Sequence, residues 1–229
     1  MKNFEFKVEE SARTKLAGMS IVYAYFSGVA NSKESIRINN EVDKICRATI
    51  EKFKDQQKIG ENETIKGIRT LFSRTGIDPT KERPSGEALI RRVVNGKGIY
   101  RINTVVDINN IISLSTGCPC GVYDADKIEG EKIAVIIGYP GQTYAGIGGK
   151  PLNAENRILT ADEKSVFGGP TADSGRTAID LGSKEILMLI YCPKNADAPF
   201  IEAALAEAKR LIRETTGGKM EYSKTFSTH

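Results

Sequence analysis

The feature that most restricts the fold is an unbroken apolar run from Ile186 to Tyr191, which reads Ile-Leu-Met-Leu-Ile-Tyr. A short apolar run without a polar face is typical of a strand that is buried on both sides, and we expect a strand over 185–192. The run is far shorter than the roughly 20 residues that a membrane-spanning helix needs. We therefore expect it in the core and expect no membrane partner.

Helices and strands are both predicted around this run, without a regular alternation. Apolar residues at three- and four-residue steps predict helices over 41–58, 63–74, 86–95 and 199–215. Ser85 is the expected N-cap of the third helix. β-branched and aromatic residues predict strands over 17–29, 131–137, 158–162 and 165–167. Residues 105–114 fit a helix or a buried strand, and we expect a helix. This mixture predicts an α+β fold and not a doubly wound sheet.

The length of 229 residues allows a sizeable core. With no repeat and no linker in the sequence, we expect a single domain over 1–229, with a loose tail over 218–229. The N-terminus alternates charged and apolar residues, unlike a secretory signal, so we expect a cytoplasmic protein.

Composition excludes little but argues against metal and disulfide chemistry. The net charge of +4 is compatible with a polyanionic partner, although the pI of about 8.8 is below the value expected of a dedicated nucleic-acid binder. The four cysteines are too few for a disulfide scaffold and are expected to be reduced thiols. The only histidine is His229, and Cys118-Pro119-Cys120 lacks the two-residue gap of a zinc hairpin. We expect no metal and no cofactor.

Three motifs occur in order along the middle of the chain. Residues 101–110 read Arg-Ile-Asn-Thr-Val-Val-Asp-Ile-Asn-Asn, residues 117–124 read Gly-Cys-Pro-Cys-Gly-Val-Tyr-Asp, and residues 127–130 read Lys-Ile-Glu-Gly. In order and spacing they resemble the B3/B4 domain of the phenylalanyl-tRNA synthetase β subunit. Residues 84–93 resemble the entry helix of stand-alone members, and residues 168–177 lie where that family has a glycine-rich loop. The resemblance covers about residues 15–215.

The resemblance implies the B3/B4 fold, with mixed sheets and flanking helices. In the synthetase this domain forms a pocket that hydrolyses tyrosine wrongly attached to phenylalanine tRNA. A chain of this length has no room for a full synthetase, so we expect hydrolysis in trans, as quality control in translation, with tRNA or aminoacyl-tRNA as the partner. One alternative is a non-catalytic module that binds RNA or an amino acid. Another is a small-molecule hydrolase or binder unrelated to tRNA.

The sequence departs from the family's pocket at three positions. Gly121 aligns with a histidine of bacterial synthetases, and Leu189 aligns with a pocket glutamate. The family's Arg-Pro-Ile-Asn tract is replaced by residues 100–103, with the arginine moved by one residue to Arg101. A site that loses the polar partners of a tyrosine hydroxyl loses the basis of tyrosine selectivity, so the family's substrate is not expected to carry over.

Polar residues of the matched segments are the candidate site. An aminoacyl ester is already activated, so hydrogen-bonding groups that position a water molecule can accelerate its hydrolysis. The candidate catalytic residues are Asn109, Asn110, Asp173, Ser174 and Thr177. Asp173 is expected to orient the water, although an exposed aspartate with an ordinary pKa is a weak base at neutral pH. The candidate pocket residues are Asn103, Gly121, Gly168 and Gly169. The candidate tRNA-binding residues are Arg91, Arg92, Arg101 and Arg176, because arginine suits phosphate contacts.

Each of these assignments has a structural alternative. Asn103 and Asp107 fit a turn held by side-chain to backbone hydrogen bonds, and the four arginines fit ion pairs. Residues 173–177 also fit a solvated loop. Tyr123 and Asp124 are expected to be an aromatic plug and a cap. We do not expect Cys120 to be a nucleophile, because the sequence offers no internal histidine to activate it.

Overall fold

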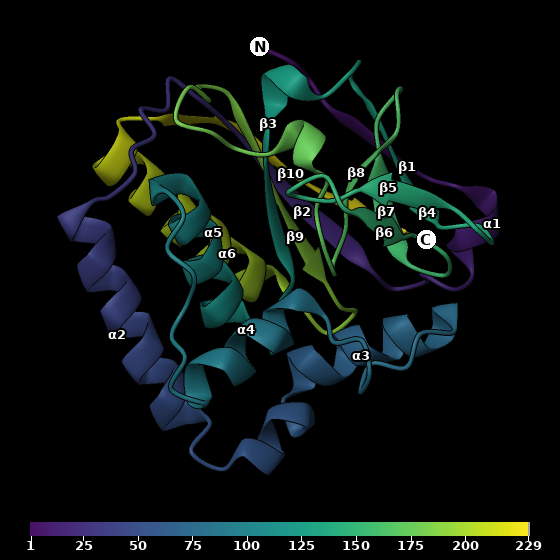
Figure 1. Cartoon of the computed structure of the whole chain (residues 1–229), viewed down its shortest axis with the longest axis horizontal. Coiled ribbons are helices and arrows are strands. Elements are labelled where there is room, and N and C mark those ends of the chain that lie inside the picture. Colours follow the sequence, from purple (N-terminus) through teal and green to yellow (C-terminus); the bar gives the residue numbers. More distant parts are fainter. Residues whose placement is uncertain (229) are drawn as a thin grey trace.

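The computed structural model describes residues 1–228 and has three layers: a layer of helices, a central antiparallel sheet and a second, mixed sheet (Figure 1). The predicted α+β class is therefore confirmed. His229 lies outside the described residues, as does any assignment made to it. Within residues 1–228, no helix combines the length and the apolar character that crossing a membrane requires.

The central sheet has the strand order β10-β2-β9-β3, and all its pairs are antiparallel. Its strands are β2 (Ser20–Ser27), β3 (Cys120–Asp124), β9 (Ile186–Cys192) and β10 (Lys219–Ser227). Every residue of β9 is buried, because helices cover one face of this sheet and the second sheet covers the other. The buried strand predicted from the apolar run is thus confirmed.

The second sheet has the order β1-β4-β7-β8, in which only the β1–β4 pair is parallel. Its strands are β1 (Glu5–Val8), β4 (Lys132–Ile137), β7 (Ile158–Ala161) and β8 (Val166–Gly168), and the short helix α1 (Glu10–Arg13) follows β1. A separate hairpin consists of β5 (Thr143–Ala145) and β6 (Pro151–Asn153). The apolar side chains between the two large sheets form the second core of the molecule.

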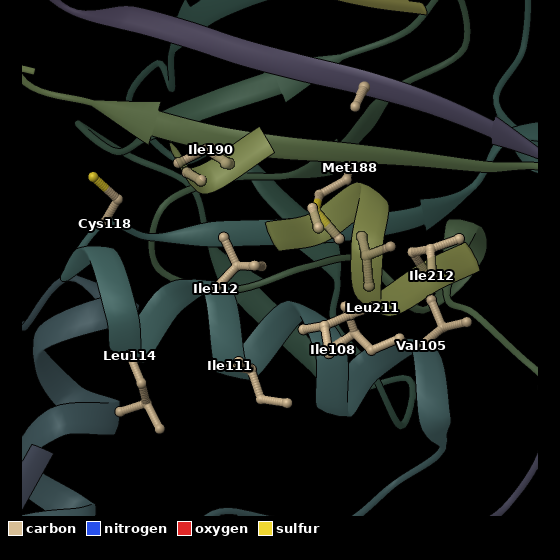
Figure 2. Close-up of a cluster of buried hydrophobic side chains, with 14 of the residues drawn as sticks. Val105, Ile108, Ile111, Ile112, Leu114, Cys118, Met188, Ile190, Leu211 and Ile212 are labelled. Carbon is tan, nitrogen blue, oxygen red and sulfur yellow. The ribbon is translucent and has the colours of Figure 1, made fainter. Parts of the chain in front are cut away.

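The helical layer contains α2 (Ile36–Lys52), α3 (Glu63–Thr75), α4 (Ser85–Val94), α5 (Thr104–Thr116) and α6 (Ala198–Thr216). Three 3-10 turns complete the described elements: η1 (Gln56–Glu61), η2 (Ala125–Lys127) and η3 (Gly175–Thr177). Figure 2 shows the main core, where Ile108 and Ile112 of α5 lie beside Met188 of β9 and Leu211 and Ile212 of α6. This packing fixes α5 against the central sheet.

Capping groups define the ends of α5. The Asn103 side chain accepts a hydrogen bond from the Val106 N–H (3.0 Å), which satisfies a backbone donor that the first helical turn leaves free. Gly117 ends the helix with φ of 75°, a left-handed conformation that suits glycine. Residues 105–114 are therefore helical, and the expected helix is confirmed.

Two helix boundaries differ from the prediction. The helix expected over 41–58 begins at Ile36, because the Ser35 hydroxyl caps the Ile38 N–H, and it ends at Lys52 before the 3-10 turn η1. Ser85 is not an N-cap. It is the first residue of α4, and its backbone N–H donates to the Pro170 carbonyl (2.9 Å), which ties α4 to the glycine-rich segment.

The loose tail predicted over 218–229 was wrong. Lys219–Ser227 forms β10, which pairs with β2 along its length. The ring of Tyr222 stacks on Tyr25 with centroids 5.5 Å apart, and the Thr228 hydroxyl donates to the Met19 carbonyl (2.9 Å). The apolar residues of this strand pack against both cores: Met220 packs against the main core, and Tyr222 and Phe226 pack against the second core.

Candidate functional site

Two adjoining cavities lie where α4 and α5 meet β3, the loop over 169–173 and the tip of the β5–β6 hairpin. The inner cavity has a volume of about 310 Å³ and the outer cavity a volume of about 610 Å³. Residues of both walls are Ser85, Asn110, Cys120, Ile147, Thr171, Ala172 and Asp173. Because these residues are shared, the two cavities form one continuous site, with Asn110 and Asp173 at the junction.

The hairpin is fixed over this site by contacts to the loop that carries Asp173. The Tyr144 hydroxyl donates to the Ala172 carbonyl (3.0 Å), and Gly146 forms a β-bridge with Ser174. Burial raises the pKa of Tyr144 to about 12, so its hydroxyl keeps its proton at neutral pH. These contacts hold Gly146, Ile147 and Leu152 of the hairpin in place as one wall of the outer cavity.

Asp173 is the ionisable carboxyl group of the cavities. Burial raises its pKa to about 6, although hydrogen bonds from the Tyr123 hydroxyl (2.6 Å) and the Gly169 backbone oppose this rise. The sequence alone suggested an exposed aspartate with an ordinary pKa, and that expectation was wrong because the loop folds inward over β3. A carboxyl group with this pKa is ionised at neutral pH and is more basic than an ordinary aspartate.

The hydrogen bond from the Tyr123 hydroxyl fixes the position of the Asp173 carboxyl group. Its ring is fully buried and packs edge-on against Phe167, with centroids 4.8 Å apart. A Cβ atom at Gly168 would lie 2.5 Å from Asp173 Oδ1 and would overlap the Tyr123 hydroxyl oxygen. A Cβ atom at Gly121 would lie 2.6 Å from Tyr123 Cζ. Neither glycine lines a cavity. Their lack of side chains makes room for Tyr123.

Asn109 and Asn110 bring two amide groups from α5 to the cavities. The Asn109 Nδ2 donates to the Cys120 carbonyl (3.2 Å), which directs its Oδ1 into a buried position without a hydrogen-bond partner within residues 1–228. Asn109 lines the inner cavity, and Asn110 lines both. Across the described chain, the Asn110 side chain has no hydrogen-bond partner either. The Asn110 amide and the Asn109 Oδ1 therefore keep hydrogen-bonding capacity that the described chain does not use.

Several predicted site residues have structural positions instead. Asn103 caps α5 and is absent from both cavity walls. The Ser174 hydroxyl accepts from the Arg176 N–H (3.2 Å), and the fully buried Thr177 hydroxyl faces the Phe167 carbonyl (3.4 Å). Of the predicted catalytic and pocket residues, Asn109, Asn110, Gly169 and Asp173 are the ones that line the cavities.

Leu189 also lies away from the site. It is buried between the two large sheets, opposite Gly121 in the pairing of β3 and β9. Neither cavity wall includes it. This position therefore offers no group to a bound molecule.

Three of the four predicted phosphate-binding arginines are engaged by buried carboxylates. The pairs are Arg91 with Glu87 (2.6 Å), Arg101 with Asp107 (2.8 Å) and Arg176 with Asp162 (2.9 Å). Arg92 is the exception, because it lines the outer cavity. The structure thus brings one of the four arginines to the site.

Glu87 is almost fully buried in α4, yet it stays charged. Burial alone would raise the pKa of Glu87, but hydrogen bonds from Arg69 (2.6 and 2.7 Å) and Arg91 (2.6 Å) bring it below the usual value. Arg83 lies 3.8 Å from the same carboxylate. These ion pairs fix α4, which forms one wall of the outer cavity.

The Cys120 thiol lines both cavities but is not a reactive nucleophile. Burial, followed by the nearby Cys192, raises the pKa of the Cys120 thiol well above its usual value. The thiol therefore stays protonated, and it points toward the Cys118 carbonyl (3.6 Å). Cys118 and Cys192 are buried in the main core. These contacts show that Cys118 and Cys192 pack as small apolar groups.

Tyr123 and Tyr100 line the cavities but were not among the site residues predicted from the sequence. Tyr123 was expected to be only a plug, but its hydroxyl contacts the carboxyl group of the site. Tyr100 lines the outer cavity from the segment between α4 and α5. The sequence did contain one indication for Tyr100, because an aromatic residue stands in residues 100–103, where the family's Arg-Pro-Ile-Asn tract is altered.

Comparisons with known proteins were made for the whole chain. The profile of the family described as B3/4 domain matches residues 67–217. The phenylalanine–tRNA ligase beta subunit of Streptococcus pyogenes serotype M3 is 29% identical over 152 residues, which cover 66% of this chain and 17% of that protein. The subunit of the same name from Streptococcus mutans serotype c is 31% identical over 108 residues, 46% of this chain and 13% of that protein. The matched region thus spans between about an eighth and a sixth of these relatives' length.

A solved structure also aligns with the chain. It is an N-terminal fragment of the phenylalanyl-tRNA synthetase beta subunit from Pyrococcus horikoshii, with a TM-score of 0.49 and 12% sequence identity. The alignment covers 98% of this chain and 55% of the fragment.

Proposed function

The chain belongs to the B3/4 domain family, and from this premise we propose that its two cavities bind an aminoacyl-tRNA and hydrolyse the ester bond. The inner cavity would hold the amino-acid side chain, and the junction between the cavities would hold the ester. We further propose that the protein acts in trans on aminoacyl-tRNAs in the cytoplasm, as quality control in translation.

The observation that carries this proposal is the position of Asp173. A general base works best when its pKa lies near the operating pH, and burial raises the pKa of Asp173 to about 6. The unpartnered amide of Asn110 lines the same junction, and the Tyr123 hydroxyl fixes the carboxyl group from the other side. A base, a free amide and a fixed orientation are what water-driven ester hydrolysis requires.

In the proposed reaction, the Asp173 carboxylate accepts a proton from a water molecule as the water oxygen attacks the ester carbonyl carbon. The Asn110 amide donates a hydrogen bond to the carbonyl oxygen, which carries the developing negative charge. The bond between carbonyl carbon and ribose oxygen then breaks, and Asp173 returns the proton to the leaving ribose hydroxyl. The products are a free amino acid and a deacylated tRNA.

The inner cavity favours an apolar amino-acid side chain. Its walls include Val106, Val122, Ala178 and Ile179, and burying apolar surface is favourable at about 25 cal/mol per Å². The buried Asn109 Oδ1 would accept a hydrogen bond from the substrate's ammonium group. The relatives are phenylalanine–tRNA ligase beta subunits by name, but the family's tyrosine substrate is not part of this proposal.

Deacylation of a panel of purified aminoacyl-tRNAs, correctly and wrongly charged, tests this function. We expect hydrolysis of one or a few esters by the wild-type protein, and a loss of roughly 10²- to 10⁴-fold in Asp173→Asn, as for removal of a general base. Asn110→Ala should also lose activity. Asp126→Asn is the matched control, because Asp126 is exposed and is absent from both cavity walls.

Two outcomes would reject the hydrolase. One is an absence of turnover on every ester by a folded protein. The other is full activity in Asp173→Asn. In the first case, binding of aminoacyl-tRNA or of a free amino acid at the same cavities would identify a non-catalytic binding module, which the unpartnered Asn109 Oδ1 and Asn110 amide would also suit.

A further inference from the structure

The outer cavity has an exposed aromatic ring on its wall. Tyr100 is 62% exposed, although it is a large side chain beside a cavity. Its ring lies under the guanidinium group of Arg92, with Arg92 Cζ 3.7 Å from the ring centroid. Because Arg92 covers one face of the ring, the exposed area belongs to the edges and to the opposite face. That face is open to another flat group.

Arg92 is held in place but is not fully bonded. Its Nη1 donates to the Tyr100 hydroxyl (3.0 Å), while its buried Nε has no hydrogen-bond partner within residues 1–228. A guanidinium group fixed by stacking and by one hydrogen bond loses little further freedom when it binds an anion. Arg92 therefore has a donor available to a bound group.

The charge around this wall is positive. Three guanidinium groups, from Arg69, Arg83 and Arg91, face the single carboxylate of Glu87, which leaves an excess of two positive charges. Arg83 is the most loosely paired of the three at 3.8 Å, and it lines the outer cavity together with Arg92. An anionic group is therefore attracted to this side of the cavity.

The opposite wall adds an apolar contact. Ile147 at the tip of the β5–β6 hairpin is 69% exposed and lines both cavities. An open aromatic face, an apolar side chain across the cavity and two arginines are the groups that bind a nucleobase together with its phosphate. This chemistry differs from that of the inner cavity, whose described wall residues include no arginine.

We propose that Tyr100 and Arg92 form a stacking platform for the nucleobase of a nucleotide, with the nucleotide's phosphate beside Arg83 and Arg92. This inference rests on the proposed function, because an aminoacyl ester joins the amino acid to a terminal nucleoside, which must then occupy the adjoining cavity. The same chemistry fits a free nucleotide or the 3′ end of an RNA. The platform sets substrate affinity and takes no part in bond breaking.

A tryptophan substitution makes the platform measurable, because the chain contains no tryptophan. In Tyr100→Trp the single indole reports on the site, and a stacked nucleobase quenches its fluorescence. Titration with AMP and with a short RNA ending in CCA is expected to give saturable quenching. Ribose 5-phosphate, which lacks the base, is expected to give none. A response to AMP alone would assign the platform to free nucleotides, and a response to both would assign it to an RNA end.

Affinities measured by calorimetry on unlabelled variants complete the test. We expect Tyr100→Ala to weaken binding of the same ligands by roughly 5- to 150-fold, as for the loss of one stacking partner, and Tyr100→Phe to bind nearly as the wild type does. Tyr139→Ala is the matched control, because Tyr139 is 64% exposed but is absent from both cavity walls. Thermal unfolding checks that each variant is folded.

Equal affinities of wild type and Tyr100→Ala, or absence of quenching in a folded Tyr100→Trp protein, would overturn the platform. These readouts measure binding without turnover. A protein that stacks AMP or RNA but hydrolyses no ester would refute only the proposed hydrolase. A protein that hydrolyses esters but is unaffected by Tyr100→Ala, in both binding and KM, would refute only the platform.

Discussion

Asp173 is the residue whose behaviour depends most on its surroundings. Its loop position in the sequence suggested exposure, but the fold places it over the buried Tyr123 and at the junction of two cavities. Burial raises its pKa to about 6, against 3.8 for an ordinary aspartate. The folded protein therefore holds this proton more tightly than the unfolded chain does.

This difference predicts a pH-dependent effect of Asp173→Asn on stability. The pKa of Asp173 is higher in the folded protein than in the unfolded chain. The contribution of its carboxyl group to folding stability is therefore fully present below about pH 4 and is lost as the pH rises through about 6. At pH 5 the wild-type carboxyl group is mostly neutral in the folded state. At pH 7.5 it carries a charge in a partly buried position, so the asparagine variant should be the more stable protein, by up to about 3 kcal/mol. Urea unfolding at both pH values measures this, and a difference independent of pH would contradict it.

At the residue scale, the sequence motifs included residues that line the cavities, but the ion-pair partners of the predicted arginines were not foreseen. The adjacent asparagines of the 101–110 motif were predicted to be catalytic, and both Asn109 and Asn110 line the inner cavity, although their role stays a prediction. Arg101 and Arg176 looked free in the sequence because their partners, Asp107 and Asp162, become close neighbours only in the folded chain. Pairing of this kind depends on tertiary contacts, which residue type and local spacing do not specify.

At the scale of elements, β3 and β8 meet over the Tyr123 ring. The glycines at 121 and 168 leave the space that this ring occupies. This arrangement also explains why a side chain at 121 is incompatible with Tyr123 in its present position. The two strands and the Asp173 loop therefore depend on one another.

We predict that Gly168→Ala disturbs both stability and the site. The new methyl group would overlap the Tyr123 hydroxyl and lie 2.5 Å from Asp173 Oδ1, so the strands must shift at a cost of about 1–3 kcal/mol. Chemical unfolding and deacylation should both show the loss. Gly182→Ala is the control, because Asp180 Oδ1 at 3.2 Å is the one atom that its Cβ would approach. Wild-type stability of Gly168→Ala would show that Tyr123 is not held as described.

Elements with strong local signals were predicted well. The buried strand β9 and the helices α3 and α6 follow apolar patterns that do not depend on distant residues, whereas the pattern of α5 fitted a helix or a strand. The strands β1, β3, β5, β6 and β10 were missed. They are short or mixed in polarity, and apart from the β5–β6 hairpin their partners lie far away in the sequence, as in the pairing of β10 with β2. Such strands are stabilised by long-range pairing and not by local propensity.

At the scale of the whole molecule, we propose that residues 1–228 form a single unit. The first and last strands both contribute to it. β1 is an edge of the second sheet and β10 an edge of the central sheet, and the Tyr222 hydroxyl links them by accepting from the Phe4 N–H (3.1 Å). The cavities lie where the helical layer meets both the edge strand β3 and the β5–β6 hairpin, so the site draws on the helical layer, the central sheet and the hairpin.

The pH dependence of deacylation by the intact protein tests the central claim most directly. On the best ester from the aminoacyl-tRNA panel, kcat/KM should rise with pH and level off above an inflection near 6, because Asp173 must lose its proton to act as the base. Asp173→Asn should lack this inflection and be slower throughout. A wild-type profile without an inflection near 6, or an unchanged profile in Asp173→Asn, would show that Asp173 is not the base and would contradict the account.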